Sequence, residues 1–374
     1  MVNIFLKKYP AFKNGVYTRF VISQFISLSG GFIQNVALSA LIAEIGGQKQ
    51  ALGIFLCISY LPVFLLSYPA SRLVTKLPVK AILIVTEAML FLLSGYLAIR
   101  QFSSVFGIYL FGGVWGTVRA FQTPAAASVT KLVCTDSELQ SGVAGYSLCQ
   151  SLSRAAGPLI AGALYTRFSY FAAFLVNTLS YIPSFILLLT LKIKPMQKAK
   201  KQKPKIIIPL FSLVAVISLC GTAYNLVFTG VSQKLSLSKT AFAIFMACVG
   251  VGTVIGALIL GNKKQVLIAG AGIPVMLLLL SVAKSGVFVG GVAVMYGVCD
   301  YLFFTSALRR INADNDKNQL PAAMGVYTAL TTGALPLGYL LLTCIVTGFG
   351  INAALYVCAF VISIGYLVFF AKSR

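Results

Sequence analysis

The chain has 374 residues, of which 59% are hydrophobic and 10% are charged, and its formal net charge is +23. Soluble domains usually carry about 25% charged residues, so this composition excludes an ordinary soluble protein and indicates several membrane spans. The lysines and arginines fall in short turns between apolar runs. We therefore expect anionic membrane lipids as partners of this charge, and no nucleic acid.

Twelve apolar runs take up nearly the whole chain, and each is long enough to cross a bilayer. We expect an all-α integral membrane protein, because membrane-spanning strands are shorter and alternate in polarity. The first run is too long for the apolar part of a cleaved signal peptide, so we expect it to remain in the mature protein. The predicted spans are residues 18–42, 51–71, 80–100, 105–130, 141–164, 169–191, 206–231, 240–261, 265–283, 286–307, 321–346 and 350–371.

The distribution of positive charge predicts the orientation in the membrane. If the first segment is cytoplasmic, the cytoplasmic segments hold 22 of the 30 lysines and arginines and the outer segments hold six. The positive-inside rule then places both termini in the cytoplasm. Lysine-rich loops without a targeting sequence favour the inner membrane of a bacterium.

A polar, basic segment with two prolines, residues 192–205, separates six spans from six. We expect this segment to be a cytoplasmic linker between an N-terminal six-helix bundle, residues 1–191, and a C-terminal six-helix bundle, residues 206–374. The two halves share short motifs in the same order, which predicts an internal repeat. The matched motifs are Gly31-x-x-x-Asn35 with Gly221-x-x-x-Asn225, Trp115-Gly116-x-x-Arg119 with Tyr296-Gly297-x-x-Asp300, and Gly157-Pro158 with Leu335-Pro336.

With this architecture, the chain resembles the major facilitator superfamily. Within it, the chain is similar to the branch of macrolide-efflux proteins and enterobactin-type siderophore exporters. The motifs that carry this likeness are Phe121-Gln-Thr-Pro124, Ala144-Gly-Tyr-Ser147, Arg154-x-x-Gly157-Pro158 and Pro336-Leu-Gly338. The resemblance implies two pseudo-symmetric halves of six helices and secondary active export of amphipathic drugs or siderophores by alternating access. One departure concerns the gate between spans two and three, where Thr75 and Lys76 stand in place of the usual aspartate and arginine.

The resemblance also implies that spans one, four, seven and ten line a central cavity. An apolar cavity with few polar groups suits an amphipathic ligand. The candidate substrate-binding residues on these spans are Gln34, Asn35, Trp115, Arg119, Tyr224, Asn225, Tyr296 and Asp300.

Charged side chains inside a bilayer are costly and indicate function. We expect Arg119 and Asp300 to pair in one state of the transporter and to separate in another; the alternative is a static ion pair that fixes helix packing. Because arginine cannot release its proton, a coupling proton must be carried by a carboxylate, with Asp300 as the first candidate and Glu87 as the second. Glu87 has an alternative structural role, as a partner of Arg72, Lys76 or Arg154.

Four further residues are candidates for gating or structural roles. Arg154 either binds an anionic group of the substrate or braces the helix that contains Gly157 and Pro158. The prolines at 158 and 336 lie well inside their spans, where we expect kinks.

Several functions are excluded by what the sequence lacks. The chain has no histidine, its eight cysteines form no CxxC pair, and it has no phosphate-binding glycine loop. We therefore expect no enzyme, metal or cofactor, and transport driven by protons or sodium. We also expect a monomer. The alternatives are a transporter of lysophospholipids or other lipid-like substrates, facilitated diffusion, and a membrane sensor or scaffold that does not transport.

Overall fold

The computed structural model describes residues 9–45, 50–74, 76–100, 105–135, 137–193, 205–221, 224–238, 240–259, 265–315 and 320–373. Helices form nearly all of these segments, and no strand occurs among them. Thr75 and most of the expected linker, residues 194–204, lie outside the described residues.

The first six predicted spans agree with helices to within a few residues. Each helix begins and ends where the apolar run gives way to polar or loop-forming residues. After the short 3₁₀ helix η1 (Pro10–Lys13), the helices are α2 (Gly15–Ile45), α3 (Ala51–Val74), α4 (Val79–Ile99), α5 (Val105–Val133), α6 (Leu139–Arg167) and α7 (Tyr170–Leu189).

The second half differs from the predicted spans in one place. Among the described residues, the seventh span holds two helices, with α8 ending at Cys220 and α9 beginning at Tyr224. The last two predicted spans, 321–346 and 350–371, agree with two helices that meet at a kink at Gly350 within the element α13. Gly350 has φ 83° and ψ 170°, a conformation that glycine adopts without a steric penalty. The helices are α8 (Ile208–Cys220), α9 (Tyr224–Lys234), α10 (Ala241–Leu258), α11 (Gln265–Ser281), α12 (Gly286–Asp314) and α13 (Leu320–Ser373).

Within the described residues, seven helical segments are long and apolar enough to cross a membrane, and Ala51–Leu66 and Ala269–Ser281 are shorter apolar helices. The helices that carry Arg119 and Arg154, α5 and α6, are not among the seven. Large apolar side chains are exposed along many helices, as expected for surfaces that face lipid.

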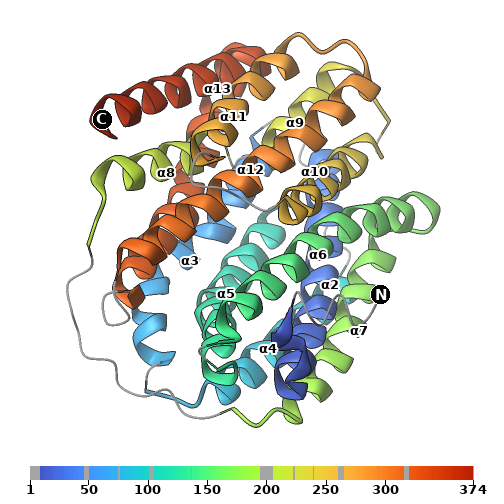
Figure 1. The fold of residues 1–374 in the computed structure, drawn as a ribbon. Coiled ribbons are helices and arrows are strands. Elements are labelled where there is room, and N and C mark those ends of the chain that lie inside the picture. The colour runs from blue at the N-terminus through green and yellow to red at the C-terminus, as the bar shows by residue number, and fades with distance from the viewer. Residues whose placement is uncertain are drawn as a thin grey trace.

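The helices pack as two related groups, the first from α2 to α7 and the second from α8 to α13. In the first group α3 packs on α5, α4 on α5 and α4 on α7, and in the second α10 packs on α12, α11 on α12 and α11 on α13. The two groups meet where α6 packs on α10 and α3 packs on α13, as Figure 1 shows. Within the described residues, this all-helical arrangement in two related groups agrees with the fold class that the sequence predicted.

Matched glycines occupy equivalent contacts in the two groups. A Cβ atom on Gly116 of α5 would overlap the carbonyl oxygen of Ser59 in α3. A Cβ atom on Gly297 of α12 would overlap the carbonyl oxygen of Val249 in α10. Both glycines therefore allow two helix backbones to approach closely. Because Arg119 and Asp300 each follow three residues later, they occupy equivalent positions in the repeat.

Candidate functional site

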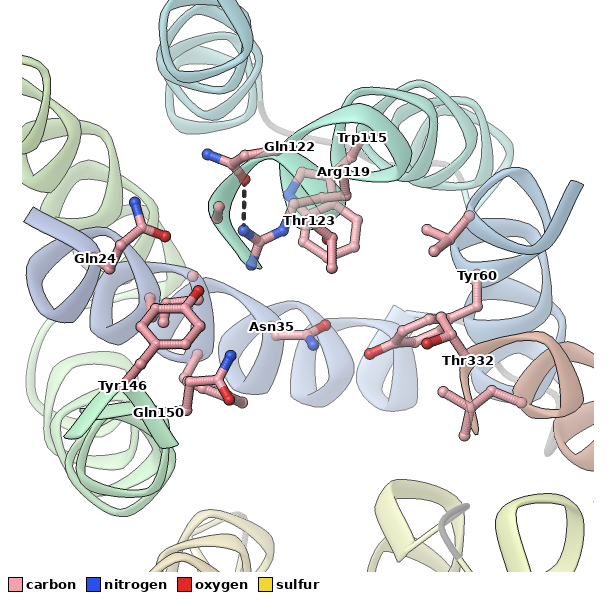
Figure 2. Close-up of a pocket in the computed structure, with 16 residues that line it drawn as sticks. Gln24, Asn35, Tyr60, Trp115, Arg119, Gln122, Thr123, Tyr146, Gln150 and Thr332 are labelled. Atoms are coloured by element: carbon pink, nitrogen blue, oxygen red, sulfur yellow. Dashed lines mark hydrogen bonds between the residues drawn. The ribbon is translucent and has the colours of Figure 1, made fainter. Parts of the chain in front are cut away.

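A cavity of about 260 Å³ lies between α2, α3, α5, α6 and α13 (Figure 2). Most of its lining comes from the first group of helices, and α13 contributes Thr332 and Leu335 from the second. The other residues that line it are Gln24, Leu28, Gly31, Phe32, Asn35, Tyr60, Val63, Trp115, Arg119, Gln122, Thr123, Ala126, Tyr146 and Gln150.

Arg119 is the charged residue of this lining. Its guanidinium carbon lies 5.2 Å from the centre of the Trp115 ring, a cation–π contact. Its Nη1 donates a hydrogen bond to Oε1 of Gln122 at 2.7 Å (Figure 2). Gly31 of α2 lies beside this side chain, and a Cβ atom there would make an ordinary contact, 3.5 Å from Nη2 of Arg119. The first of the two matched motifs, Trp115-Gly116-x-x-Arg119, thus places a cation and a neighbouring aromatic ring at the cavity.

Gln122 connects Arg119 to a carboxylate inside the first helix group. Its Nε2 donates to Oε2 of Glu87 in α4 at 2.6 Å, while Ser184 of α7 donates to Oε1 of Glu87 at 2.5 Å. The Ser184 hydroxyl lies 2.9 Å from that of Ser23 in α2. Glu87 is fully buried, and the ion pairs found in the described part of the chain do not include it. Neutral donors therefore satisfy a buried acid that lies two hydrogen bonds away from the cavity arginine.

Asp300 pairs with Arg154 in this structure. Nη1 of Arg154 in α6 lies 3.7 Å from Oδ2 of Asp300 in α12, so the pair joins the two helix groups. Oδ1 of Asp300 and Nε of Arg154 are buried and have no hydrogen-bond partner among the described residues. Arg119 and Asp300, which we expect to pair in one state and to separate in another, are separate in this conformation. Asp300 lies beside Arg154, and Arg119 lies beside Gln122 and Trp115.

Tyr296 and Tyr224 have different surroundings. Tyr296 is buried, its hydroxyl donates to the carbonyl oxygen of Gly221 at the end of α8, and its ring packs edge-on against Phe228 and Tyr224. This position braces α12 against the end of α8. Tyr224 is half-buried, and its phenol lies near Arg154 in the region between the groups.

The two neighbouring polar residues of α2 face different surroundings. Asn35 lines the cavity, as Figure 2 shows. Gln34 lies inside the first helix group, where its Oε1 accepts a hydrogen bond from Asn177 at 2.7 Å, and Asn177 also donates to Ser94 at 3.0 Å. In the second group Asn225 is buried within α9 and does not line the cavity. Of the matched Gly-x-x-x-Asn motifs, only the first therefore contributes an amide to this cavity.

The predicted gating residues include one close helix contact. A Cβ atom on Gly157 would overlap Cβ of Phe32, so this glycine allows α6 to pack closely on α2. Pro158 lies buried inside α6 and Pro336 inside α13. Lys76 is exposed in the turn after α3, and Thr75 lies outside the described residues.

The structure also shows cavity residues that the sequence did not indicate. Tyr60 lies on α3, and Tyr146 and Gln150 lie on α6. They belong to the second and fifth spans, which we did not expect to line the cavity. Tyr146 falls within a motif that supported the family resemblance, but that resemblance gave no role for it.

A family profile described as Major Facilitator Superfamily matches residues 20–309. The chain belongs to this superfamily. It is therefore a multi-pass membrane protein and a secondary transporter of small molecules, and not an enzyme, as the sequence predicted. No curated protein sequence matches the chain.

Three solved transporters share the fold at low sequence identity. The nucleoside transporter NupG is 12% identical with a TM-score of 0.73, and the match covers 96% of this chain and 99% of that one. A bacterial homologue of the iron transporter ferroportin is 16% identical with a TM-score of 0.66, covering 96% and 100%. The human organic anion transporter MFSD10 is 14% identical with a TM-score of 0.67, covering 94% and 99%. These similarities establish the fold and leave the substrate undetermined.

Proposed function

We propose that this protein exports amphipathic small molecules across the bacterial inner membrane in exchange for protons. The observation that carries this proposal is the hydrogen-bonded connection from Arg119 at the cavity through Gln122 to the buried Glu87. In this connection Arg119 can bind a ligand, Glu87 can ionise, and both are hydrogen-bonded to Gln122. A change at either end can therefore alter the hydrogen bonds available at the other.

Glu87 is the proposed site of the coupling proton. Its carboxylate is held by the amide of Gln122 and the hydroxyl of Ser184, and not by an ion pair within the described structure. It can therefore bind or release a proton without first separating from a cation. When Glu87 is protonated, it can also donate a hydrogen bond, which would rearrange the amide of Gln122 and free Nη1 of Arg119.

Asp300 and Arg154 form the proposed gate between the two groups. The ion pair spans α6 and α12, and its 3.7 Å separation leaves one carboxylate oxygen without a hydrogen-bond partner among the described residues. A pair that is only partly satisfied costs less to open than one with every hydrogen bond made. Asp300 remains a second candidate for the proton, once Arg154 has moved away.

The close contacts between the groups support alternating access. Gly53 near the start of α3 contacts Thr343, and Gly162 near the end of α6 contacts Ala243. Both contacts lie toward the membrane face opposite the start of α2, so the groups are closed together on that face. We assign the start of α2 to the cytoplasm from the positive-inside rule, which makes this conformation closed to the outside.

The macrolide-efflux and siderophore-exporter branch remains our proposed subfamily, on the motifs around Pro124, Arg154 and Pro336. The test is proton movement in proteoliposomes that contain the purified protein and a pH-sensitive dye. A panel of a macrolide, a siderophore and a lysophospholipid is added to wild type and to Glu87→Gln. We expect one ligand class to drive proton release with wild type only. Transport of a ligand without proton movement would refute the antiport mechanism.

A further inference from the structure

The charge of the cavity lining limits the ligands that it can bind favourably. Arg119 contributes a positive charge, and none of the sixteen lining residues is acidic. Glu87 lies behind Gln122 and is fully buried, so it does not present its charge to a ligand. A cationic ligand would therefore meet a guanidinium without a compensating carboxylate on the cavity wall, and like charges at close range repel.

Unpartnered donors at the cavity favour the same ligand chemistry. Nε2 of Gln24 and Nε1 of Trp115 are buried and have no hydrogen-bond partner among the described residues. Both residues line the cavity, and Gln24 is only 3% exposed. A buried donor without a partner is costly, so these groups gain from a ligand that carries acceptors. Together with Arg119, they form a donor-rich wall that suits a carboxylate or a similar oxyanion.

The remainder of the lining suits an aromatic body of limited size. The rings of Phe32, Tyr60, Trp115 and Tyr146 border the cavity, and aromatic faces bind planar apolar groups through offset or edge contacts. The volume of about 260 Å³ lies below the range of about 300–1,000 Å³ that is common for drug-sized ligands. A small aromatic molecule is therefore a better match to this conformation than a macrolide.

We infer that the transported ligand is a small aromatic organic anion whose oxyanion binds Arg119 and whose ring packs against Trp115. This inference rests on the proposed transport function and specifies its substrate class. Binding of the oxyanion competes with Oε1 of Gln122 for the guanidinium, so ligand binding alters the same amide that holds Glu87. Substrate charge and proton occupancy are thereby coupled through one residue.

The chain offers a built-in probe, because Trp115 is its single tryptophan. Wild-type protein is placed in nanodiscs of phosphatidylcholine and titrated with 4-phenylbutyrate, 4-phenylbutyramide and 4-phenylbutylamine, which share one body and differ in charge. We expect a saturable change in Trp115 fluorescence with the anion at a concentration about tenfold to a hundredfold lower than with the amide, as expected for a charge-assisted hydrogen bond. We expect the amine to bind more weakly than the amide.

Two variants identify the group responsible for the charge preference. Arg119→Gln should bind the anion and the amide with equal affinity, while Arg167→Gln should retain the preference because Arg167 is exposed and lies outside the cavity lining. Equal affinity of wild type for all three probes would overturn the inference, and so would loss of preference in Arg167→Gln alone. If Arg119→Gln does not fold, the wild-type charge series still decides, since it requires no variant.

Two further measurements are needed. One distinguishes a soluble anion from an anionic lipid headgroup as the ligand, and the other distinguishes failure of the substrate class from failure of the proposed transport function. Adding phosphatidylglycerol to the nanodiscs should leave 4-phenylbutyrate binding unchanged; strong competition would instead indicate an anionic lipid headgroup as the ligand. Proton-coupled transport is measured separately in proteoliposomes with the three probes. Transport of the neutral amide and not of the anion would overturn the substrate class and leave the transport proposal in place. Anion-selective binding without proton movement would overturn the proposal of proton-coupled transport and leave the substrate class in place.

Discussion

Gln122 is the single residue that connects the cavity cation to the buried acid. Its amide accepts from Arg119 and donates to Glu87, and methionine has a similar shape without these groups. We expect Gln122→Met to bind ligand with affinity within about tenfold of wild type and to release fewer protons per ligand. Loss of one donor to a buried carboxylate should also lower stability by about 1–3 kcal/mol. The measurement is ligand-driven proton release in proteoliposomes, together with the thermal midpoint.

Gln150→Met is the matched control for this prediction. Gln150 lines the same cavity from α6, is exposed, and is not part of the hydrogen-bonded connection to Glu87. An equal loss of proton release in both variants would show that polarity of the cavity, and not the connection through Gln122, supports coupling.

The ion pair between Arg154 and Asp300 predicts a non-additive pattern of stability. Asp300→Asn removes the negative charge and leaves Arg154 unpaired. Breaking a buried pair costs about 3–5 kcal/mol, and we expect less here because the Arg154 side chain is 30% exposed. The double variant Arg154→Gln/Asp300→Asn should be more stable than the sum of the single changes predicts, by about 0.5–3 kcal/mol. Thermal unfolding of the four proteins in detergent measures this, and strict additivity would contradict a direct interaction.

The sequence indicated polar and charged residues inside the spans, but not which of them share a cavity. Of the eight candidate binding residues, Asn35, Trp115 and Arg119 line the cavity, and the other five, Gln34, Tyr224, Asn225, Tyr296 and Asp300, do not. The partner of Asp300 was not predicted, since a matched position in the repeat does not determine which arginine lies within reach. The hydrogen bonds of Glu87 join α4, α5 and α7. The order of apolar and polar residues within one span does not indicate which other helices that span contacts.

At the scale of the helix, glycine contacts predict which substitutions separate two helices. A Cβ atom on Gly297 of α12 would overlap the Val249 carbonyl oxygen of α10. We expect Gly297→Ala to lower stability by about 1–3 kcal/mol through overpacking. Gly291 in the same helix is exposed, and a Cβ atom added there would meet no other atom within 4 Å, so Gly291→Ala should be neutral or stabilising by up to about 1 kcal/mol. Thermal midpoints of both variants check this, and equal destabilisation would refute the packing argument.

The helices themselves followed closely from the apolar runs, because a bilayer requires a continuous helical segment of a set length. The end of α8 at Cys220 was not predicted, whereas the kink at Gly350 lies where the eleventh and twelfth predicted spans meet. Both involve glycines inside apolar runs, and the chain has 33 glycines, most of which sit in helices as packing contacts. The sequence of an apolar run does not distinguish a glycine that allows close helix packing from a glycine at which a helix ends.

For the whole molecule, alternating access requires the closed face to open. Gly162 of α6 and Ala243 of α10 face each other there, with 2.9 Å between a Cβ atom on Gly162 and that of Ala243. A disulfide needs about 3.5–4.5 Å between Cβ atoms, so a slight separation would permit one. In a background without the native cysteines, oxidised Gly162→Cys/Ala243→Cys should bind ligand but not transport it, and a reductant should restore transport. Full transport by the cross-linked protein would contradict opening at this face.

The most direct test of proton-coupled export is uphill movement of ligand in proteoliposomes under an imposed pH gradient. Radiolabelled 4-phenylbutyrate is present at equal concentration on both sides, and its distribution is followed with wild type and with Glu87→Gln. We predict that wild type concentrates the ligand on the acidic side, while Glu87→Gln exchanges labelled for unlabelled ligand without concentrating it. Wild type that only equilibrates the ligand, or Glu87→Gln that concentrates it as well, would contradict the account.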